Sequence, residues 1–285
     1  MFNDPLTSMT LIVLTLVTAW ASVAAWRGLM RRHRDGLSSP GVLRAVVAAI
    51  ALGSAGVFAY RALWVHRDWL PLEAHVDGLL LIAALLGAVV WFVLSRPAVA
   101  GLAAFALPVL ALVLGWAVCA SAWTFRPFDV DRLDPLWKTI HLAGVYAGTL
   151  SAALAAIAGA MFLFVEGRLR QKQTLGRAEP MTSLETLERL IVRAATLGFA
   201  LLTLGLVAGL VLHPQESALG PGWWHSPKVV LATLAWLSYA VVMNVRYATL
   251  FRGRRAAWLA MAGFVLLLLT YGVVTAMPAA EGGLR

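Results

Sequence analysis

The sequence predicts an all-α, polytopic integral membrane protein with about eight transmembrane helices and both termini outside. Hydrophobic residues make up 61% of the 285 residues and charged residues only 13%, whereas soluble domains hold roughly 45–50% apolar and about 25% charged residues. A soluble chain of this composition would lack the polar residues needed to cover its surface. Cys119 is the single cysteine, so a disulfide scaffold is excluded as well.

Eight apolar runs long enough to cross a bilayer follow one another along the chain. A hydrocarbon core of about 30 Å needs about 20 mostly apolar residues, and lipid offers their backbone no partners, so each run should be helical. The runs are bounded by charged residues, proline or glycine. Their expected ranges are 6–29, 41–64, 74–95, 98–123, 137–165, 189–212, 228–250 and 256–277.

Local signals support the later helix starts in particular. Thr182 and Glu185 have the spacing of a capping box, which predicts a helix start just before the sixth run. Pro227 suits the first turn of the seventh helix.

The first run is not expected to be a cleaved signal peptide, because its basic cluster follows the apolar stretch. A change of character near residue 125 predicts two regions, an N-terminal four-helix region over 1–124 and a C-terminal one over 125–285.

The basic residues divide unevenly between alternate connections. Sixteen of the 23 lysines and arginines lie on one predicted side and seven on the other. Cytoplasmic loops carry the excess of positive charge, so the richer side should be cytoplasmic, and an even number of spans then places both termini outside. We therefore interpret the net charge of +9 as topology anchors rather than a nucleic-acid surface, and expect a multi-pass protein of the bacterial inner (plasma) membrane.

Histidines and large aromatic residues gather at the predicted outer face. His33 is cytoplasmic, whereas the other five histidines, His66, His75, His141, His213 and His225, fall at or near the outer side. Trp137 precedes His141 by one helical turn, and Trp223 and Trp224 abut His225. Haem suits such a surface, because imidazole ligates iron axially and flat aromatic side chains cover the macrocycle. An aromatic belt with interfacial histidines is the structural alternative, and zinc fits less well because it usually takes four close N or S ligands.

Three segments of the C-terminal half carry a family resemblance. They are the helix start from Trp137 to His141 with Tyr146, the run 183–189, and the loop 223–228. Together they resemble the cytochrome c assembly family of haem-handling membrane proteins, which includes CcsA, CcmC and the HemX and YpjD proteins. The loop is similar to a reduced form of the tryptophan-rich outer motif of that family. The resemblance is best over about 135–275, and it is closest to a divergent HemX-like member.

Two differences from the family pattern reduce the number of haem ligands that the resemblance implies. Asn244 stands where the family has a histidine in the seventh helix, and we expect it to hydrogen-bond between helices rather than bind iron. A further family histidine is missing from 271–278. At most one family haem ligand, His141, therefore carries over.

The combined hypothesis is a haem-handling membrane protein, not itself an enzyme, that assists cytochrome c maturation by binding or presenting haem at the outer face. Expected partners are haem, the lipid bilayer, other maturation proteins and apocytochrome c, with no nucleic acid. Two other functions stay open: a HemX-like regulator of tetrapyrrole synthesis acting through residues 168–182, and a small-solute transporter, which the near absence of charge in the span centres disfavours. The expected haem-site residues are His141 and His225 as metal ligands, His213 as an alternative, Trp137, Trp223 and Trp224 as the platform, and Lys228 or Arg126 for the propionates.

Overall fold

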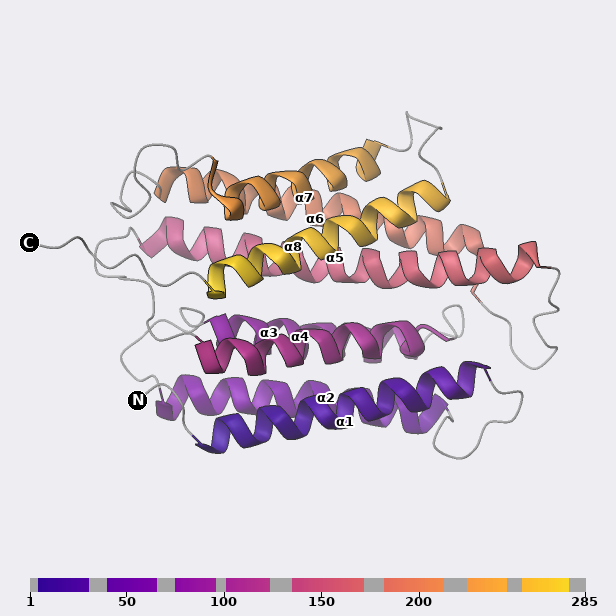
Figure 1. Cartoon of the computed structure of the whole chain (residues 1–285), viewed down its shortest axis with the longest axis horizontal. Coiled ribbons are helices and arrows are strands. Elements are labelled where there is room, and N and C mark those ends of the chain that lie inside the picture. The colour runs from indigo at the N-terminus through magenta and orange to yellow at the C-terminus, as the bar shows by residue number, and fades with distance from the viewer. Residues whose placement is uncertain are drawn as a thin grey trace, which may run out of the picture. The chain divides into compact units, whose positions relative to one another are not determined.

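The computed structural model describes residues 5–30, 40–65, 75–95, 101–123, 135–171, 182–212, 225–244 and 253–276. Long helices occupy nearly all of these ranges (Figure 1). They are α1 (Pro5–Met30), α2 (Pro40–Tyr60), the π-helical segment η2 (Arg61–Val65), α3 (His75–Leu94), α4 (Ala103–Trp123), α5 (Pro135–Arg170), α6 (Leu184–Leu212), α7 (Pro227–Met243) and α8 (Arg254–Ala276).

The helices confirm the predicted all-α, polytopic class. Seven are long and apolar enough to cross a membrane, whereas α7 is apolar but has 17 residues. The run expected over 228–250 continues beyond Asn244 into residues outside the described ranges. The side of the membrane on which the termini lie stays a prediction.

The chain forms two compact units. Unit one comprises Met1–Ala122 together with Ile157–Leu190, and unit two comprises Trp123–Ala156 together with Ile191–Arg285. The divisions therefore fall near residue 122, within α5 and within α6. Residues 157–170 of α5 belong to unit one, and residues 135–156 belong to unit two.

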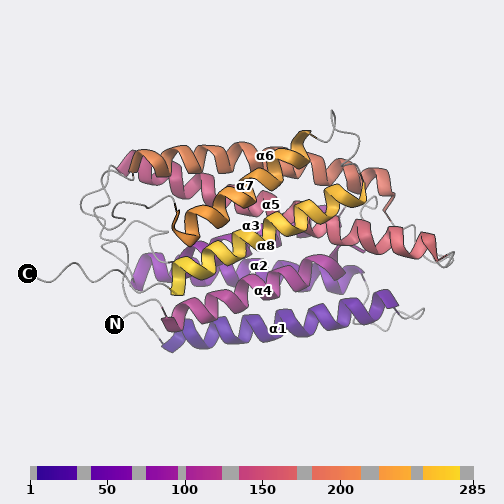
Figure 2. The same cartoon turned by 45° about the horizontal axis from the view of Figure 1, so that its top comes forward.

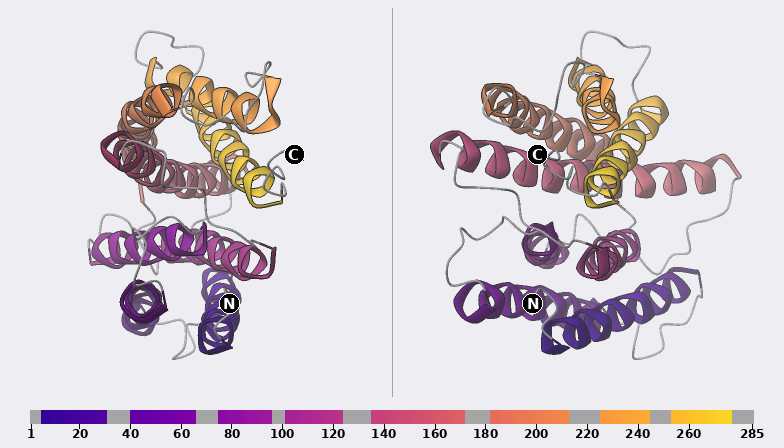
Figure 3. Two further views of the ribbon diagram at one scale, coloured as in Figure 1. Left: turned by 90° about the vertical axis from the view of Figure 1, so that its left-hand side faces the viewer. Right: turned by 60° about the vertical axis from the view of Figure 1, so that its left-hand side comes forward.

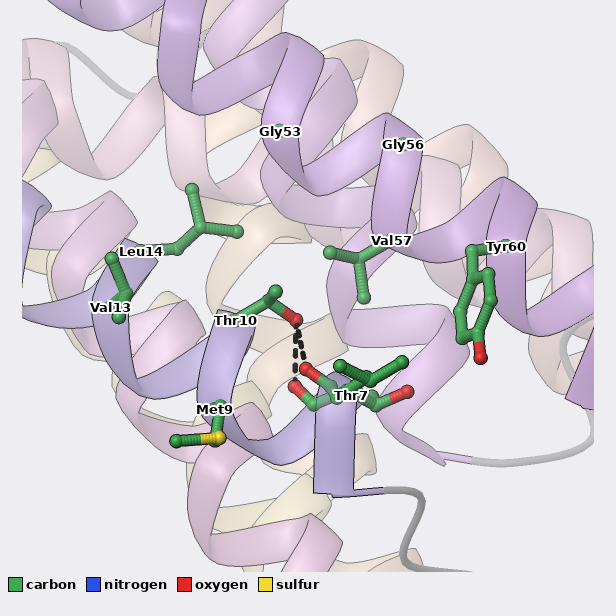
Figure 4. A pocket seen from close by; sticks show the side chains of 10 residues that line it. Thr7, Met9, Thr10, Val13, Leu14, Gly53, Gly56, Val57 and Tyr60 are labelled. Carbon is green, nitrogen blue, oxygen red and sulfur yellow. Dashed lines mark hydrogen bonds between the residues drawn. The ribbon is translucent and has the colours of Figure 1, made fainter.

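In unit one, α2 packs against both α1 and α3 (Figure 3). An aromatic cluster joins α1, α4 and α5: the rings of Trp26, Phe105 and Phe164 have centroids 5.5–5.7 Å apart. A shallow groove of about 610 Å³ lies between α1 and α2. The Thr10 hydroxyl donates to the carbonyls of Leu6 and Thr7 at 2.8 and 3.0 Å, and dashed lines mark its hydrogen bonds in Figure 4. The groove is therefore largely apolar, as expected for helices that face lipid.

An ion pair is buried in unit one. The Arg61 Nε donates to a carboxylate oxygen of Asp77, and the two side chains are 5% and 6% exposed. Arg61 opens η2 and Asp77 lies in the first turn of α3, so the pair joins the adjacent ends of two helices. Removing one partner would break this buried ion pair, which costs about 3–5 kcal/mol.

The start of α6 is capped one residue later than predicted. The Ser183 Oγ accepts the backbone N–H of Thr186 at 3.2 Å, and α6 begins at Leu184. Thr182 is buried and precedes the capping position. The predicted helix start is confirmed, but Ser183 rather than Thr182 provides the cap, because the residue directly before the first helical residue reaches the third amide.

In unit two, α5, α6, α7 and α8 form a closed bundle, seen end-on in the left panel of Figure 3. The Trp236 Nε1–H donates to the Thr203 Oγ1 at 2.8 Å, which joins α7 to α6. The Tyr239 hydroxyl donates to the Ala260 carbonyl at 3.1 Å, which joins α7 to α8. Stacked rings of Tyr146 and Tyr271, with centroids 6.3 Å apart, join α5 to α8.

Candidate functional site

In the four-helix bundle of unit two, the backbones of α5 and α6 approach each other closely. A Cβ atom on Gly144 would lie 2.7 Å from the backbone nitrogen of Gly205 and 2.9 Å from the carbonyl oxygen of Leu201. One turn further along α5, a Cβ atom on Gly148 would lie 2.7 Å from the Cγ of Leu202. Glycines four residues apart on one helix face permit such contact between membrane helices. The two backbones are therefore held in one register.

This register fixes the orientation of His141. The Nδ1 of His141 lies 2.7 Å from the carbonyl oxygen of Gly205. A carbonyl oxygen only accepts hydrogen bonds, so in the neutral ring Nδ1 carries the proton and Nε2 keeps its lone pair. Histidines that bind metals nearly always donate their other ring N–H in this way. The half-buried imidazole of His141 thus keeps the lone pair of Nε2, the atom that a ligating imidazole would use.

A second glycine of α6 makes room for the ring. A Cβ atom on Gly209 would lie 3.0 Å from both Cε1 and Nδ1 of His141. That distance is shorter than an ordinary van der Waals contact of about 3.5–4.0 Å. Gly205 and Gly209, one turn apart, therefore provide the hydrogen-bond acceptor and the space for the same imidazole.

The described part of the predicted site lies at one end of unit two. Trp137 is half-buried and lies one turn before His141 on α5. His225 is exposed just before α7, and Lys228 lies in the first turn of that helix. Both α5 and α7 begin at the end where α6 finishes (Figure 1 and Figure 2). The structure therefore brings these four predicted residues to the same end of the bundle.

The other predicted site residues lie outside the described ranges; they are His213, Trp223, Trp224 and Arg126, together with the side chain of Lys228. Within those ranges no group of three or more His, Cys, Asp or Glu side chains is placed to hold a metal ion.

Asn244 differs from its prediction. It is exposed at the C-terminal cap of α7, and its Nδ2 donates to the carbonyl oxygen of Ala240 at 2.8 Å. The expectation of a hydrogen bond between helices is wrong, because the amide closes the last turn of its own helix.

Sequence reasoning missed three residues near His141. Gly205 and Gly209 contact its ring from α6, and Lys138, one turn earlier on α5, is only 6% exposed. The spacing of three residues between Lys138 and His141 was the available signal, since it places both on one side of a helix.

The fold and this site define a polytopic helical membrane protein with an oriented histidine at one end of a four-helix bundle. Residues 72–279, most of the chain, match the family model described as Cytochrome C assembly protein. The chain belongs to this family. No solved structure matches it.

Curated relatives named cytochrome c biogenesis protein CcsA match the chain over different lengths. One from Prochlorococcus marinus (strain MIT 9515) is 29% identical over 58% of this chain and 61% of its own length. One from Synechococcus sp. (strain RCC307) is 36% identical over 33% of this chain and 30% of its own. One from Porphyra purpurea is 24% identical over 88% of both chains. The chain thus spans less than two thirds of the length of the first two relatives. All three relatives are named CcsA, so the comparisons do not support the expected resemblance to a HemX-like member of the family.

Proposed function

We propose that this chain binds haem at the end of unit two where α5 and α7 begin, and that it acts in cytochrome c maturation in the bacterial plasma membrane. Membership of the cytochrome c assembly family and the names of its CcsA relatives support the general role. The observation that carries the specific assignment is the hydrogen bond of 2.7 Å between His141 Nδ1 and the Gly205 carbonyl.

The residues of the site fit an iron porphyrin. The Nε2 of His141 would bind the iron, and His225 or His213 would provide a second nitrogen. Trp137 on α5 would contact the porphyrin ring, together with Trp223 and Trp224. When bound, haem would supply an iron that imidazole nitrogens ligate and a flat apolar ring that stacks on aromatic side chains.

The contribution of the protein is orientation. The Gly205 carbonyl accepts the hydrogen bond from Nδ1 and so holds the imidazole in one tautomer, with the lone pair on Nε2. Because the α5–α6 register is set by backbone contact at Gly144, the carbonyl cannot move away without separating the helices. The site therefore holds haem in a set position, and covalent attachment takes place on an apocytochrome partner rather than on this chain.

The test is the level of c-type cytochromes in cells whose own copy is replaced by variants at matched protein abundance. His141→Ala removes the axial nitrogen, and we expect c-type cytochromes to fall at least about tenfold, in the range of losses seen for metal-site changes. His141→Gln should fall equally, since an amide binds haem iron poorly. His33→Ala, on the predicted cytoplasmic side, is the matched control and should retain wild-type levels. Normal cytochrome levels in both His141 variants would overturn the proposal.

A further inference from the structure

Arg168, near the end of α5, contacts only neutral side chains in the described part of unit one. Its guanidinium lies over the ring of Phe164, one turn earlier on the same helix, with its central carbon 5.0 Å from the ring centroid. Its Nη2 donates to the Sδ of Met30 on α1 at 3.4 Å. A thioether sulfur is a weak acceptor, whereas a guanidinium carries five N–H donors. Most of the hydrogen-bonding capacity of this half-buried cation is therefore available to a ligand.

Among the described residues no carboxylate pairs with Arg168. The nearest acidic residue in the sequence is Glu166, which pairs with Arg170 at 2.7 Å. Two residues along an α-helix correspond to about 200° of rotation, so Glu166 and Arg168 leave α5 on opposite sides. The described acidic side chains therefore leave the charge of Arg168 to be balanced from outside.

A second arginine lies beside the same contact, on α1. Arg27 is exposed and precedes Met30 by three residues, so the two side chains leave α1 about 60° apart. Met30 in turn contacts Arg168. No acidic residue occurs anywhere in α1. Two arginines thus gather around Met30, and a surface of one charge sign attracts an anion.

An exposed apolar stripe of α1 leads away from these two arginines along the helix. Its members follow one another at intervals of three or four residues, a spacing that places them on one face. They are Leu16, Trp20, Val23, Trp26 and Met30. Trp26 also packs against Phe164, with ring centroids 5.6 Å apart, so the stripe adjoins the guanidinium of Arg168. The surface therefore combines an anion-binding end with a long apolar face.

We propose that Arg168 and Arg27 bind the phosphate of an anionic phospholipid whose acyl chains lie along this stripe of α1. A planar guanidinium matches the oxygens of a phosphate in pairs, and such charge-assisted hydrogen bonds are strong. Phe164 and Met30 hold the Arg168 group at the end of the apolar stripe, where the lipid headgroups lie. Free phosphate would use the arginines but not the stripe, and a phospholipid uses both. This site lies in unit one and does not depend on haem binding.

The experiment compares two lipids with identical acyl chains. The purified full-length chain in detergent is titrated with phosphatidylglycerol, which is anionic, and with phosphatidylcholine, whose phosphate is balanced by its own cation. Bound lipid and oligomeric state are read together by native mass spectrometry. The variants are Arg168→Met, Arg27→Met and the double substitution. Arg189→Met is the matched control, because it removes an exposed arginine whose guanidinium is already paired with Glu185.

We expect wild type to bind phosphatidylglycerol about 25-fold more tightly than phosphatidylcholine, about fivefold for each arginine. Arg168→Met and Arg27→Met should each lower this ratio about fivefold, and the double variant should bring it close to one. Affinity for phosphatidylcholine should change by less than about twofold, because the apolar stripe is retained. Arg189→Met should keep the wild-type ratio.

Several results would overturn the proposal. Wild type without preference for the anionic lipid does so directly, as does an Arg168→Met variant with the wild-type ratio or a control that loses the preference equally. If Arg168→Met fails to accumulate, Arg27→Met is read in the same way, since Arg27 is exposed. Displacement of the lipid by excess inorganic phosphate would show a site for the free anion instead. A lipid-free dimer that Arg168→Met abolishes would assign the surface to a second copy of the chain.

Discussion

Replacing Gly144 by alanine tests the packing that orients His141. The added Cβ would lie 2.7 Å from the nitrogen and 2.9 Å from the Cα of Gly205. Carbon atoms pack favourably at about 3.5–4.0 Å, so the new methyl group is about 1 Å too close. The atoms that it meets are backbone atoms of α6, which cannot rotate aside. The two helices must therefore separate by about 1 Å at this point.

The substitution should change both the free energy of folding and the affinity for haem. Overpacking of this kind costs about 1–3 kcal/mol of folding free energy, which the higher helix propensity of alanine offsets by up to about 1 kcal/mol. The same separation lengthens the hydrogen bond from His141 Nδ1 to the Gly205 carbonyl, now 2.7 Å, to about 3.7 Å, which is too long for a hydrogen bond. Stability and haem affinity should fall together.

Both quantities can be measured on purified protein in detergent, the first by thermal unfolding followed by circular dichroism and the second by haem titration. Gly167→Ala on the same helix is the matched control, because nothing lies within 4 Å of its added Cβ, and it should be as stable as wild type or more so. A Gly144→Ala variant with wild-type melting temperature and haem affinity would refute the reasoning.

Three further predictions concern other parts of the chain. Asp77→Asn should destabilise unit one by about 3–5 kcal/mol, because it breaks the buried ion pair with Arg61; an unchanged unfolding curve in detergent would contradict the buried pair. Ser183→Ala should cost about 1 kcal/mol by removing the cap of α6, detectable as a lower melting temperature, whereas a loss below about 0.3 kcal/mol would argue against the cap. Reporter fusions should place residues 170–180 in the cytoplasm and 124–134 outside, and a reversal at either range would refute the predicted orientation.

The spans were predictable because hydropathy is a local property of the chain. The first run was expected over 6–29, and α1 covers Pro5–Met30. The fifth run was expected to end at 165, but α5 continues to Arg170. Glu166 and Arg170 pair along the helix at 2.7 Å, so the last turn is stabilised by charge where the apolar pattern has already ended.

The site was predictable only in part. His141 could be selected from its neighbours in the sequence, but its hydrogen bond joins residues 64 positions apart and depends on the register in which α5 crosses α6. The burial of Lys138 was equally hidden, since a lysine near a membrane surface ordinarily extends its charged end to water. Both features arise from tertiary packing, which no local pattern specifies.

The central claim, that His141 Nε2 binds haem iron, is tested most directly by the absorption spectrum of the haem-loaded protein. Wild type should show a Soret band with sharp reduced α and β bands, the spectrum of six-coordinate haem. His141→Ala should lose haem or show a five-coordinate spectrum, and added imidazole should restore the six-coordinate bands by filling the vacated axial position. A six-coordinate spectrum in His141→Ala without imidazole, at wild-type haem content, would contradict the claim.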